Sequence, residues 1–172
     1  MAEVAVSRRQ FLRGDVRGAR VPLRPPWAVD EPDFLRRCTR CDDCARACPA
    51  QVIRRGSGGY PEVAFDRGPC TFCGDCAAVC KAGAFREVRD ARLGAFAHRA
   101  AITGVCLAAS GVVCRTCGDH CDAQAIRFRL AVGGRSHPLV DAARCNGCGA
   151  CVGACPAEAV RVQVPMLAEA VA

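Results

Sequence analysis

Three groups of four cysteines share one spacing, with two, two and three residues between successive members. They are Cys38, Cys41, Cys44 and Cys48, then Cys70, Cys73, Cys76 and Cys80, and finally Cys145, Cys148, Cys151 and Cys155. A proline follows the last cysteine of the first and third groups, and Lys81 follows that of the second. Thiolates bind soft metals such as iron and zinc, so these cysteines are candidate metal ligands.

The spacing favours [4Fe–4S] clusters over the other common uses of cysteine. A short loop with a cysteine at every third residue can place three sulfurs on three irons of a cubane, and a cysteine from elsewhere reaches the fourth iron. Zinc sites usually combine two Cys-x2-Cys pairs across a longer spacer, or mix cysteine with histidine. Disulfides need an oxidising compartment. We therefore predict three [4Fe–4S] clusters, with small residues that let the loops approach them closely at Gly74, Gly147, Gly149 and Gly153.

A fourth group of cysteines departs from this spacing. Cys106, Cys114, Cys117 and Cys121 are separated by seven, two and three residues, so the loop carries an insertion before its second member. Four cysteines in this order predict a fourth [4Fe–4S] cluster. A [3Fe–4S] cluster, a labile [4Fe–4S] cluster and an empty site are the alternatives. His120 could also serve as a ligand, although a histidine that faces solvent is the simpler interpretation.

The residues that follow each fourth cysteine also repeat. Residues 48–54 read CPAQVIR, and residues 80–86, 121–127 and 155–161 read CKAGAFR, CDAQAIR and CPAEAVR. The chain therefore carries four copies of one unit, the third of them modified. Two copies lead into hairpin-like sequence with a Gly-rich turn, at residues 52–65 and 126–140. The residues between the third and fourth cysteines, such as 45–47, can start a helical turn.

Each pair of copies resembles a bacterial two-cluster ferredoxin, a small fold with pseudo-twofold symmetry. The resemblance implies that the fourth cysteine of each run binds the cluster of the other run. Four sites are expected on this basis: site I is Cys38, Cys41, Cys44 and Cys80; site II is Cys48, Cys70, Cys73 and Cys76; site III is Cys106, Cys114, Cys117 and Cys155; and site IV is Cys121, Cys145, Cys148 and Cys151.

The expected architecture is α+β, with two tandem bacterial-type two-cluster ferredoxin modules. A basic N-terminal arm takes residues 1–33, the first module 34–86, a connector 87–105, the second module 106–163 and a tail 164–172. Leu, Ile, Val and Phe total only 37 of 172 residues, just above the level at which charged chains stay disordered. The clusters must therefore supply much of the folding free energy, and the metal-free chain should be largely unfolded.

Composition and motifs argue against several classes of function. No segment reaches the roughly 20 apolar residues of a transmembrane helix. Arginine outnumbers lysine 23 to 1, but the arginines are scattered and aromatic residues are few, so we expect no nucleic-acid partner. The formal charge of +7 is offset by clusters that each carry about −2 with their four thiolates. The sequence has no Ser/His/Asp arrangement and no phosphate-binding loop, so we expect no enzyme activity.

The N-terminal arm carries a motif that resembles a twin-arginine export signal, SRRQFL at residues 7–12. The RGDVRGAR stretch that follows is too polar for the apolar region of such a signal. We therefore predict a non-cleaved arm and a cytoplasmic location, with residues 7–24 as the place to look for a partner. Further along, Trp27 either docks on a partner or packs the arm onto the first module.

Several segments outside the regular cysteine runs resemble the NapF family, ferredoxin-type accessory proteins of the periplasmic nitrate reductase system. They are the arm with Arg8 and Arg9, the RPPW segment at 24–27, the GGYP turn at 58–61, the divergent third run and the AIRFR strand at 125–129. The resemblance covers nearly the whole chain. It implies a protein that contacts the molybdenum-containing catalytic subunit before export and assists its maturation, including assembly of its [4Fe–4S] cluster.

The sequence leaves three functions open. A maturation factor is the first, as the family resemblance implies. An electron-transfer polyferredoxin that supplies a redox partner is the second, because several clusters in one chain suit either role. A zinc-binding or structural cysteine protein is the third, and it would lack both brown colour and inorganic sulfide.

Overall fold

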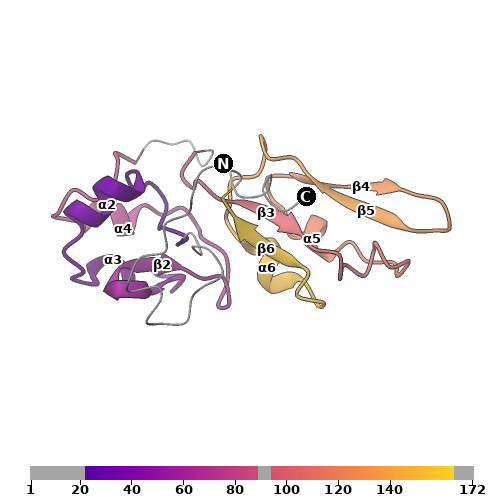
Figure 1. Ribbon diagram of the computed structural model, residues 1–172, viewed down its shortest axis with the longest axis horizontal. Helices are drawn as coiled ribbons and strands as arrows, with labels where there is room; N and C mark the ends of the chain where they lie inside the picture. Colours follow the sequence, from indigo (N-terminus) through magenta and orange to yellow (C-terminus); the bar gives the residue numbers. More distant parts are fainter. Residues whose placement is uncertain (1–21, 89–93, 165–172) are drawn as a thin grey trace, which may run out of the picture.

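The computed structural model describes residues 22–88 and 94–164, whose elements fall into two halves that lie side by side (Figure 1). The first half holds α2 (Glu31–Arg37), α3 (Asp43–Arg46), α4 (Asp75–Ala78), β1 (Ile53–Arg55), β2 (Pro61–Val63) and the 3-10 turn η1 (Ser57–Gly59). The second half holds α5 (Thr116–Asp119), α6 (Ala150–Ala154), β3 (Arg99–Ile102), β4 (Ile126–Leu130), β5 (Ser136–Val140) and β6 (Val160–Gln163). Most of the predicted arm, including its twin-arginine-like motif, and nearly all of the tail lie outside the described residues.

Short helices and two-stranded sheets make up the secondary structure, as the predicted α+β class requires. Both predicted hairpins are present, with β1 antiparallel to β2 and β4 antiparallel to β5. In each hairpin a buried isoleucine opens the first strand, Ile53 opposite Val63 and Ile126 opposite Val140. Among the described residues, no helix is long and apolar enough to cross a membrane.

Three of the short helices, α3, α4 and α6, begin directly after a residue in the left-handed backbone region. These residues are Asp42 (φ 64°), Gly74 (φ 85°) and Gly149 (φ 81°), and each follows the second cysteine of its run. A left-handed residue turns the chain sharply, and glycine adopts this conformation without steric cost. Helix α5 begins instead after Arg115, at φ −134°. The modified third run therefore enters its helix through a different turn.

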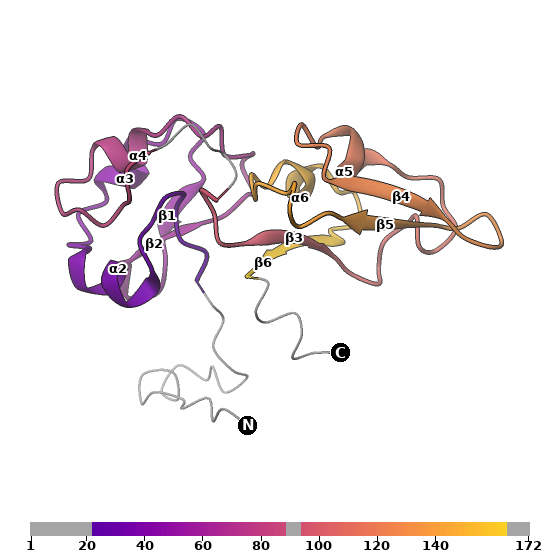
Figure 2. The same ribbon diagram turned by 90° about the horizontal axis from the view of Figure 1, so that it is seen from above.

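Strands β3 and β6 form a third sheet that the sequence did not predict. β3 lies in the segment expected to be a connector, and Arg99 to Ile102 pair antiparallel with Gln163 to Val160. Figure 2 shows β3 and β6 at the inner end of the second half, from which the β4–β5 hairpin extends away from the first half. Within residues 22–88, the first half has a single antiparallel bridge at the corresponding place, between Ala28 and Phe85.

Residues 22–30 pack against the first half. Arg24 forms an ion pair with Glu31 through two nitrogens, at 2.6 and 2.8 Å, and its guanidinium lies over the ring of Phe34. Trp27 is buried and meets Phe72 edge to face, with ring centroids 6.2 Å apart. Of the two roles open for Trp27, the structure therefore shows packing onto the first half.

Thiols are a substantial part of the hydrophobic core in both halves. The core of the first half includes Cys44 and Cys76, and that of the second includes Cys117, Cys145 and Cys151. A smaller cluster around Cys106 completes the second half. Aliphatic and aromatic side chains surround these thiols instead of forming a core without them.

Candidate iron–sulfur cluster sites

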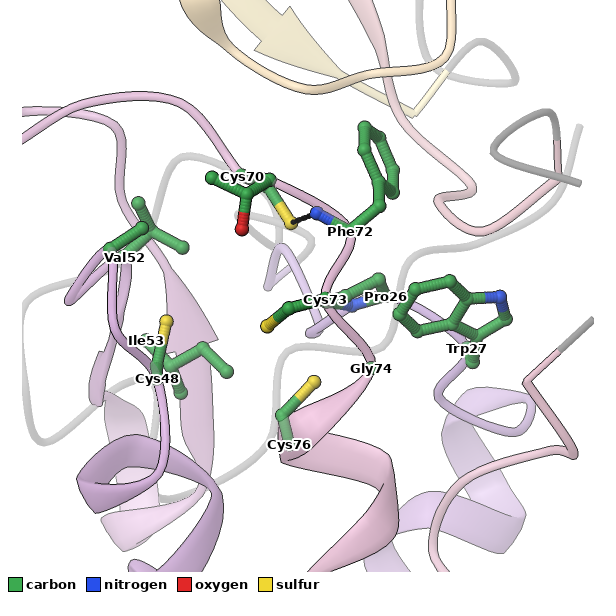
Figure 3. Close-up of a pocket in the computed structure, with 12 residues that line it drawn as sticks. Pro26, Trp27, Cys48, Val52, Ile53, Cys70, Phe72, Cys73, Gly74 and Cys76 are labelled. Atoms are coloured by element: carbon green, nitrogen blue, oxygen red, sulfur yellow. Dashed lines mark hydrogen bonds between the residues drawn. The ribbon is translucent and has the colours of Figure 1, made fainter. Parts of the chain in front are cut away.

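One cavity of the first half is lined by the four cysteines expected for site II: Cys48, Cys70, Cys73 and Cys76. Figure 3 shows their sulfur atoms around one space, with Trp27 and Ile53 at its border. The rest of the wall is mostly apolar. Cys73 is exposed, whereas Cys76 is buried, so this four-thiol cavity has one ligand at the surface.

The second half contains two cavities of the same kind. One is lined by Cys121, Cys145, Cys148 and Cys151, the expected site IV, and the other by Cys106, Cys114, Cys117 and Cys155, the expected site III. Like site II, both are lined by four cysteines and mostly apolar side chains. The insertion in the third run therefore does not prevent its cysteines from surrounding one cavity.

Site I is identified by the surroundings of Cys44. The neighbouring thiols of Cys38, Cys41 and Cys80 all act to raise its pKa. Cys41 is exposed, and Cys38 and Cys80 are half-buried. The structure thus gathers the cysteines expected for sites II, III and IV around three cavities, with the fourth cysteine exchanged between runs, and the neighbours of Cys44 agree with the set expected for site I.

Burial makes at least one thiol in each of the four sites a poor acid in the absence of a cation. Burial, together with neighbouring thiols, raises the pKa of Cys76 and of Cys151 from 9.0 to about 12. The same causes raise the pKa of Cys44, Cys70 and Cys117 to about 11. Four thiolates in so small an apolar space would repel one another, and the positive charge of iron removes that penalty. The donor set and its surroundings therefore fit a bound iron–sulfur cluster.

The repeated segment after each fourth cysteine has a structural role that the sequence did not reveal. The third residue after the cysteine has a left-handed backbone in all four copies, at Gln51, Gly83, Gln124 and Glu158 (φ 52°, 65°, 48° and 48°). The residue that follows is almost fully buried in every copy, as Val52, Ala84, Ala125 and Ala159. The fourth residue after the cysteine is small or apolar in every copy. This repetition was the sequence signal for the turn, because burying that residue in all four copies requires the same backbone turn each time.

Backbone amides donate hydrogen bonds to sulfurs of the cluster sites, two of them from this turn and one from the loop that begins at Cys70. The amide of Ala125 lies 3.3 Å from Cys121 Sγ, and that of Ala159 lies 3.2 Å from Cys155 Sγ. The amide of Phe72 donates to Cys70 Sγ at 3.4 Å. Hydrogen bonds to the sulfurs of an iron–sulfur cluster tune its reduction potential, so these turns can adjust the redox chemistry as well as position the thiols.

His120 does not line the cavity of site III, for which it was considered as a ligand. It lies at the border of site IV, is exposed, and its Nδ1 is 3.0 Å from the carbonyl oxygen of Thr116. Cys155 instead completes the set at site III. Within residues 22–88 and 94–164, no group of three or more potential ligands is arranged to hold a single metal ion; the thiols lie around cavities.

Comparisons with known proteins identify cluster-binding sequence in both halves. A family model described as a 4Fe-4S dicluster domain matches residues 37–84, and one described as a 4Fe-4S binding domain matches residues 136–157. The chain is 47% identical to the ferredoxin-type protein NapF of Haemophilus influenzae, over 89% of this chain and 91% of that protein. It is 42% identical to NapF of Escherichia coli K12, over 94% and 96% of the two chains.

A more distant relative shares the pattern over less of its length. The methylamine utilization ferredoxin-type protein MauM of Methylophilus methylotrophus is 33% identical, over 75% of this chain and 64% of that protein. The level of identity and the coverage are both much higher for the two NapF proteins.

Proposed function

Because the chain belongs to the NapF family of ferredoxin-type iron–sulfur proteins, we propose that it binds four [4Fe–4S] clusters and serves the periplasmic nitrate reductase system. All sixteen cysteines are then ligands, four at each of sites I to IV, in tandem two-cluster modules at residues 34–86 and 106–163. The observation that carries this proposal is the gathering of the cysteines into four-thiol sets, three of them around a common cavity and the fourth indicated by the neighbours of Cys44.

The chain offers three features that would hold the clusters. A left-handed residue follows the second cysteine in the runs of sites I, II and IV. Mostly apolar walls line the cavities of sites II, III and IV, and backbone amides donate to one sulfur in each of these three sites. When bound, the clusters supply one-electron redox centres and the cations that stabilise buried thiolates. No catalytic residue is needed for this role, so the protein acts on a partner instead of on a small substrate.

The partner in this proposal is the catalytic, molybdenum-containing subunit of periplasmic nitrate reductase, met as a cytoplasmic precursor before its export. The protein assists maturation of that subunit, including assembly of the subunit's own [4Fe–4S] cluster. Cys41 of site I and Cys73 of site II are exposed, so two sites present a ligand where a partner can reach it. This accessibility supports a role in cluster assembly.

Electron supply to a redox partner is the second candidate function. Cys44 of site I and Cys76 of site II lie in one hydrophobic core, and Cys117 of site III and Cys151 of site IV lie in another. This arrangement favours the second function. Redox centres that share a core are close enough to exchange electrons. Reversible one-electron reduction, with rescue of nitrate reductase activity by an artificial reductant in cells that lack the protein, would favour this second function.

The first experiment is anaerobic purification of the full chain, with iron and inorganic sulfide measured per chain. Four cubanes require about 16 irons and 16 sulfides, whereas an empty site III gives about 12 of each. Zinc without sulfide would refute an iron–sulfur function altogether.

The second experiment tests the partner. The catalytic-subunit precursor should co-purify with this protein, and its iron content should fall in cells that lack it. Arg8→Ala/Arg9→Ala in the arm should weaken the association, and unchanged binding would remove the arm from recognition. A precursor with normal iron in the deletion strain would contradict the maturation role while leaving electron supply open.

A further inference from the structure

The two halves of the molecule meet at two cluster-binding loops. The backbone amide of Cys70, in site II, donates a hydrogen bond of 2.9 Å to the carbonyl oxygen of Cys148, in site IV. The two thiols are also close enough for Cys148 to act on the pKa of Cys70. Ligands of different modules are therefore neighbours, joined directly through the main chain.

Aromatic side chains and two glycines hold these loops together. Phe65 is buried against Gly149, where a Cβ atom would lie 2.2 Å from the phenylalanine ring. Phe65 also contacts Phe96 and His98 edge to face, with centroids 6.3 and 5.7 Å apart. His98 Nε2 lies 2.9 Å from the carbonyl oxygen of Gly147. The fourth run therefore lies directly on the first half, at positions where only glycine leaves enough room.

The order of the sites along the molecule follows from these contacts. Sites I and II share the core of the first half through Cys44 and Cys76, and Cys44 also acts on the pKa of Cys76. Sites III and IV share the core of the second half through Cys117 and Cys151. The contact between the Cys70 and Cys148 loops, called the junction below, joins site II to site IV. Sites II and IV are therefore the inner sites and face each other, and sites I and III lie at the ends.

We propose that the four clusters form a single electron-transfer series in the order I–II–IV–III, instead of two independent pairs. This inference rests on the proposed occupancy of all four sites, and it does not depend on the identity of the partner. One electron enters at an end site from a reduced one-electron carrier protein, which is oxidised by one electron. It leaves at the other end to an oxidised one-electron centre of a second protein, which is reduced. No covalent bond forms or breaks, and no proton is required.

The main chain supplies a continuous path across the junction. It runs from Cys70 Sγ through Cβ, Cα and N, crosses the hydrogen bond, and continues through O, C, Cα and Cβ to Cys148 Sγ. Electron tunnelling proceeds more readily through covalent and hydrogen bonds than across a gap of the same length. Phe65 and Gly149 act as positioning residues, because they keep the two ends of this path in contact.

The test compares Cys73→Ala, which removes a ligand of site II, with Cys41→Ala, which removes the equivalent ligand of site I. Both cysteines are the exposed second members of regular runs, so the two variants are matched. Each full-length protein is purified anaerobically, checked for about 12 irons per chain, and fully reduced with Ti(III) citrate. Electron paramagnetic resonance, with power saturation, then separates magnetically coupled clusters from isolated ones.

The series predicts different spectra for the two variants. Cys73→Ala isolates site I and should show about one uncoupled, slowly relaxing spin per chain, whereas Cys41→Ala leaves II, IV and III coupled and should show none. Two independent pairs predict an uncoupled spin in both variants. An uncoupled spin in Cys41→Ala, or its absence in Cys73→Ala, would overturn the proposed order.

A second pair of variants keeps every ligand. Phe65→Ala removes the aromatic contact at the junction, and Val63→Ala removes a buried side chain of the same core away from it. We expect weaker coupling only in Phe65→Ala, at full iron content, and equal coupling in the two variants would contradict the positioning role. A wild-type iron content near 12 would instead refute the four-cluster function, so the two failures are distinguishable.

Discussion

The two halves of the molecule build the same kind of site with different local structures. The first half has two regular cysteine runs. The segments before the first run and after the second are joined by one bridge, Ala28 to Phe85, beside the buried Trp27. The second half contains the modified run and closes its ends with a complete strand pair, β3 with β6. Site III is nevertheless a cavity lined by four cysteines, as site II is.

This difference shows which features a cluster site requires. Helix α5 lacks the left-handed residue that precedes α3, α4 and α6, so four cysteines can surround a cavity without that turn. The left-handed residue after the fourth cysteine is present in all four copies, and so is the buried residue that follows it. The backbone conformation after the fourth cysteine is therefore more uniform among the four runs than the conformation after the second cysteine.

Removal of iron should have the largest effect, and it should affect both halves. Without clusters the cysteine sites are left unfilled in cores with few aliphatic side chains, and binding free energy that contributes to folding is lost. We expect loss of the cooperative unfolding transition and of most secondary structure after anaerobic chelation, measured by circular dichroism. A native-like metal-free protein, or unfolding of only one half, would contradict this expectation.

Replacement of Cys117 tests whether the modified run is equivalent to the regular ones. Cys117 is buried in site III, and Cys117→Ser should lower the iron content by about four per chain, from about 16 to about 12. The matched control is Cys76→Ser in site II, which should lower it by the same amount. Iron unchanged by Cys117→Ser, with the expected loss in Cys76→Ser, would show that site III holds no cluster.

Gly149→Ala should reveal how closely the second half packs on the first. Its Cβ would lie 2.2 Å from the Phe65 ring, at a φ of 81°, so a steric clash adds to left-handed strain. We expect a loss of about 3 kcal/mol in anaerobic urea unfolding, from strain of 1–2 kcal/mol and overpacking. Gly83→Ala is the control, because it shares the left-handed backbone, at φ 65°, but meets nothing within 4 Å. Equal losses in the two variants would argue against close packing at the junction.

The smallest predicted effect is the pH dependence that His98 gives to the junction. Burial, with a smaller contribution from Arg99, lowers the pKa of His98 from 6.5 to about 4. Between these values the unfolded chain binds a proton that the folded chain does not, so stability is complete above pH 6.5 and falls toward pH 4. The loss by pH 5 should be about 2 kcal/mol.

His98→Gln provides the control for this pH dependence. Glutamine can still donate to the carbonyl oxygen of Gly147 but does not titrate. The difference in urea midpoint between wild type and variant should therefore change with pH. Acid lability of the clusters affects both proteins equally, so it cancels in this difference. A difference that is constant from pH 7 to pH 5 would contradict the assigned shift.

The sequence predicted the hairpins because each alternates around a Gly-rich turn that is local to the chain. It did not predict β3, because the RAAI residues at 99–102 carry no strand signal of their own and their partner, β6, lies about sixty residues later. The roles of Phe65, Phe96 and His98 were missed for the same reason. Their significance arises only where the two halves pack against each other.

The sequence by itself determined the chemistry of this protein: the cysteine spacing indicates iron–sulfur clusters, and the resemblance of each pair of repeats to a two-cluster ferredoxin predicts which cysteines lie together. Spacing is sufficient for this because three ligands of each cluster lie within one short loop. Only the tertiary structure decided that sites II and IV face each other, through Cys70 and Cys148. That arrangement depends on shape complementarity between distant segments, above all Phe65 against Gly149, which no local pattern encodes.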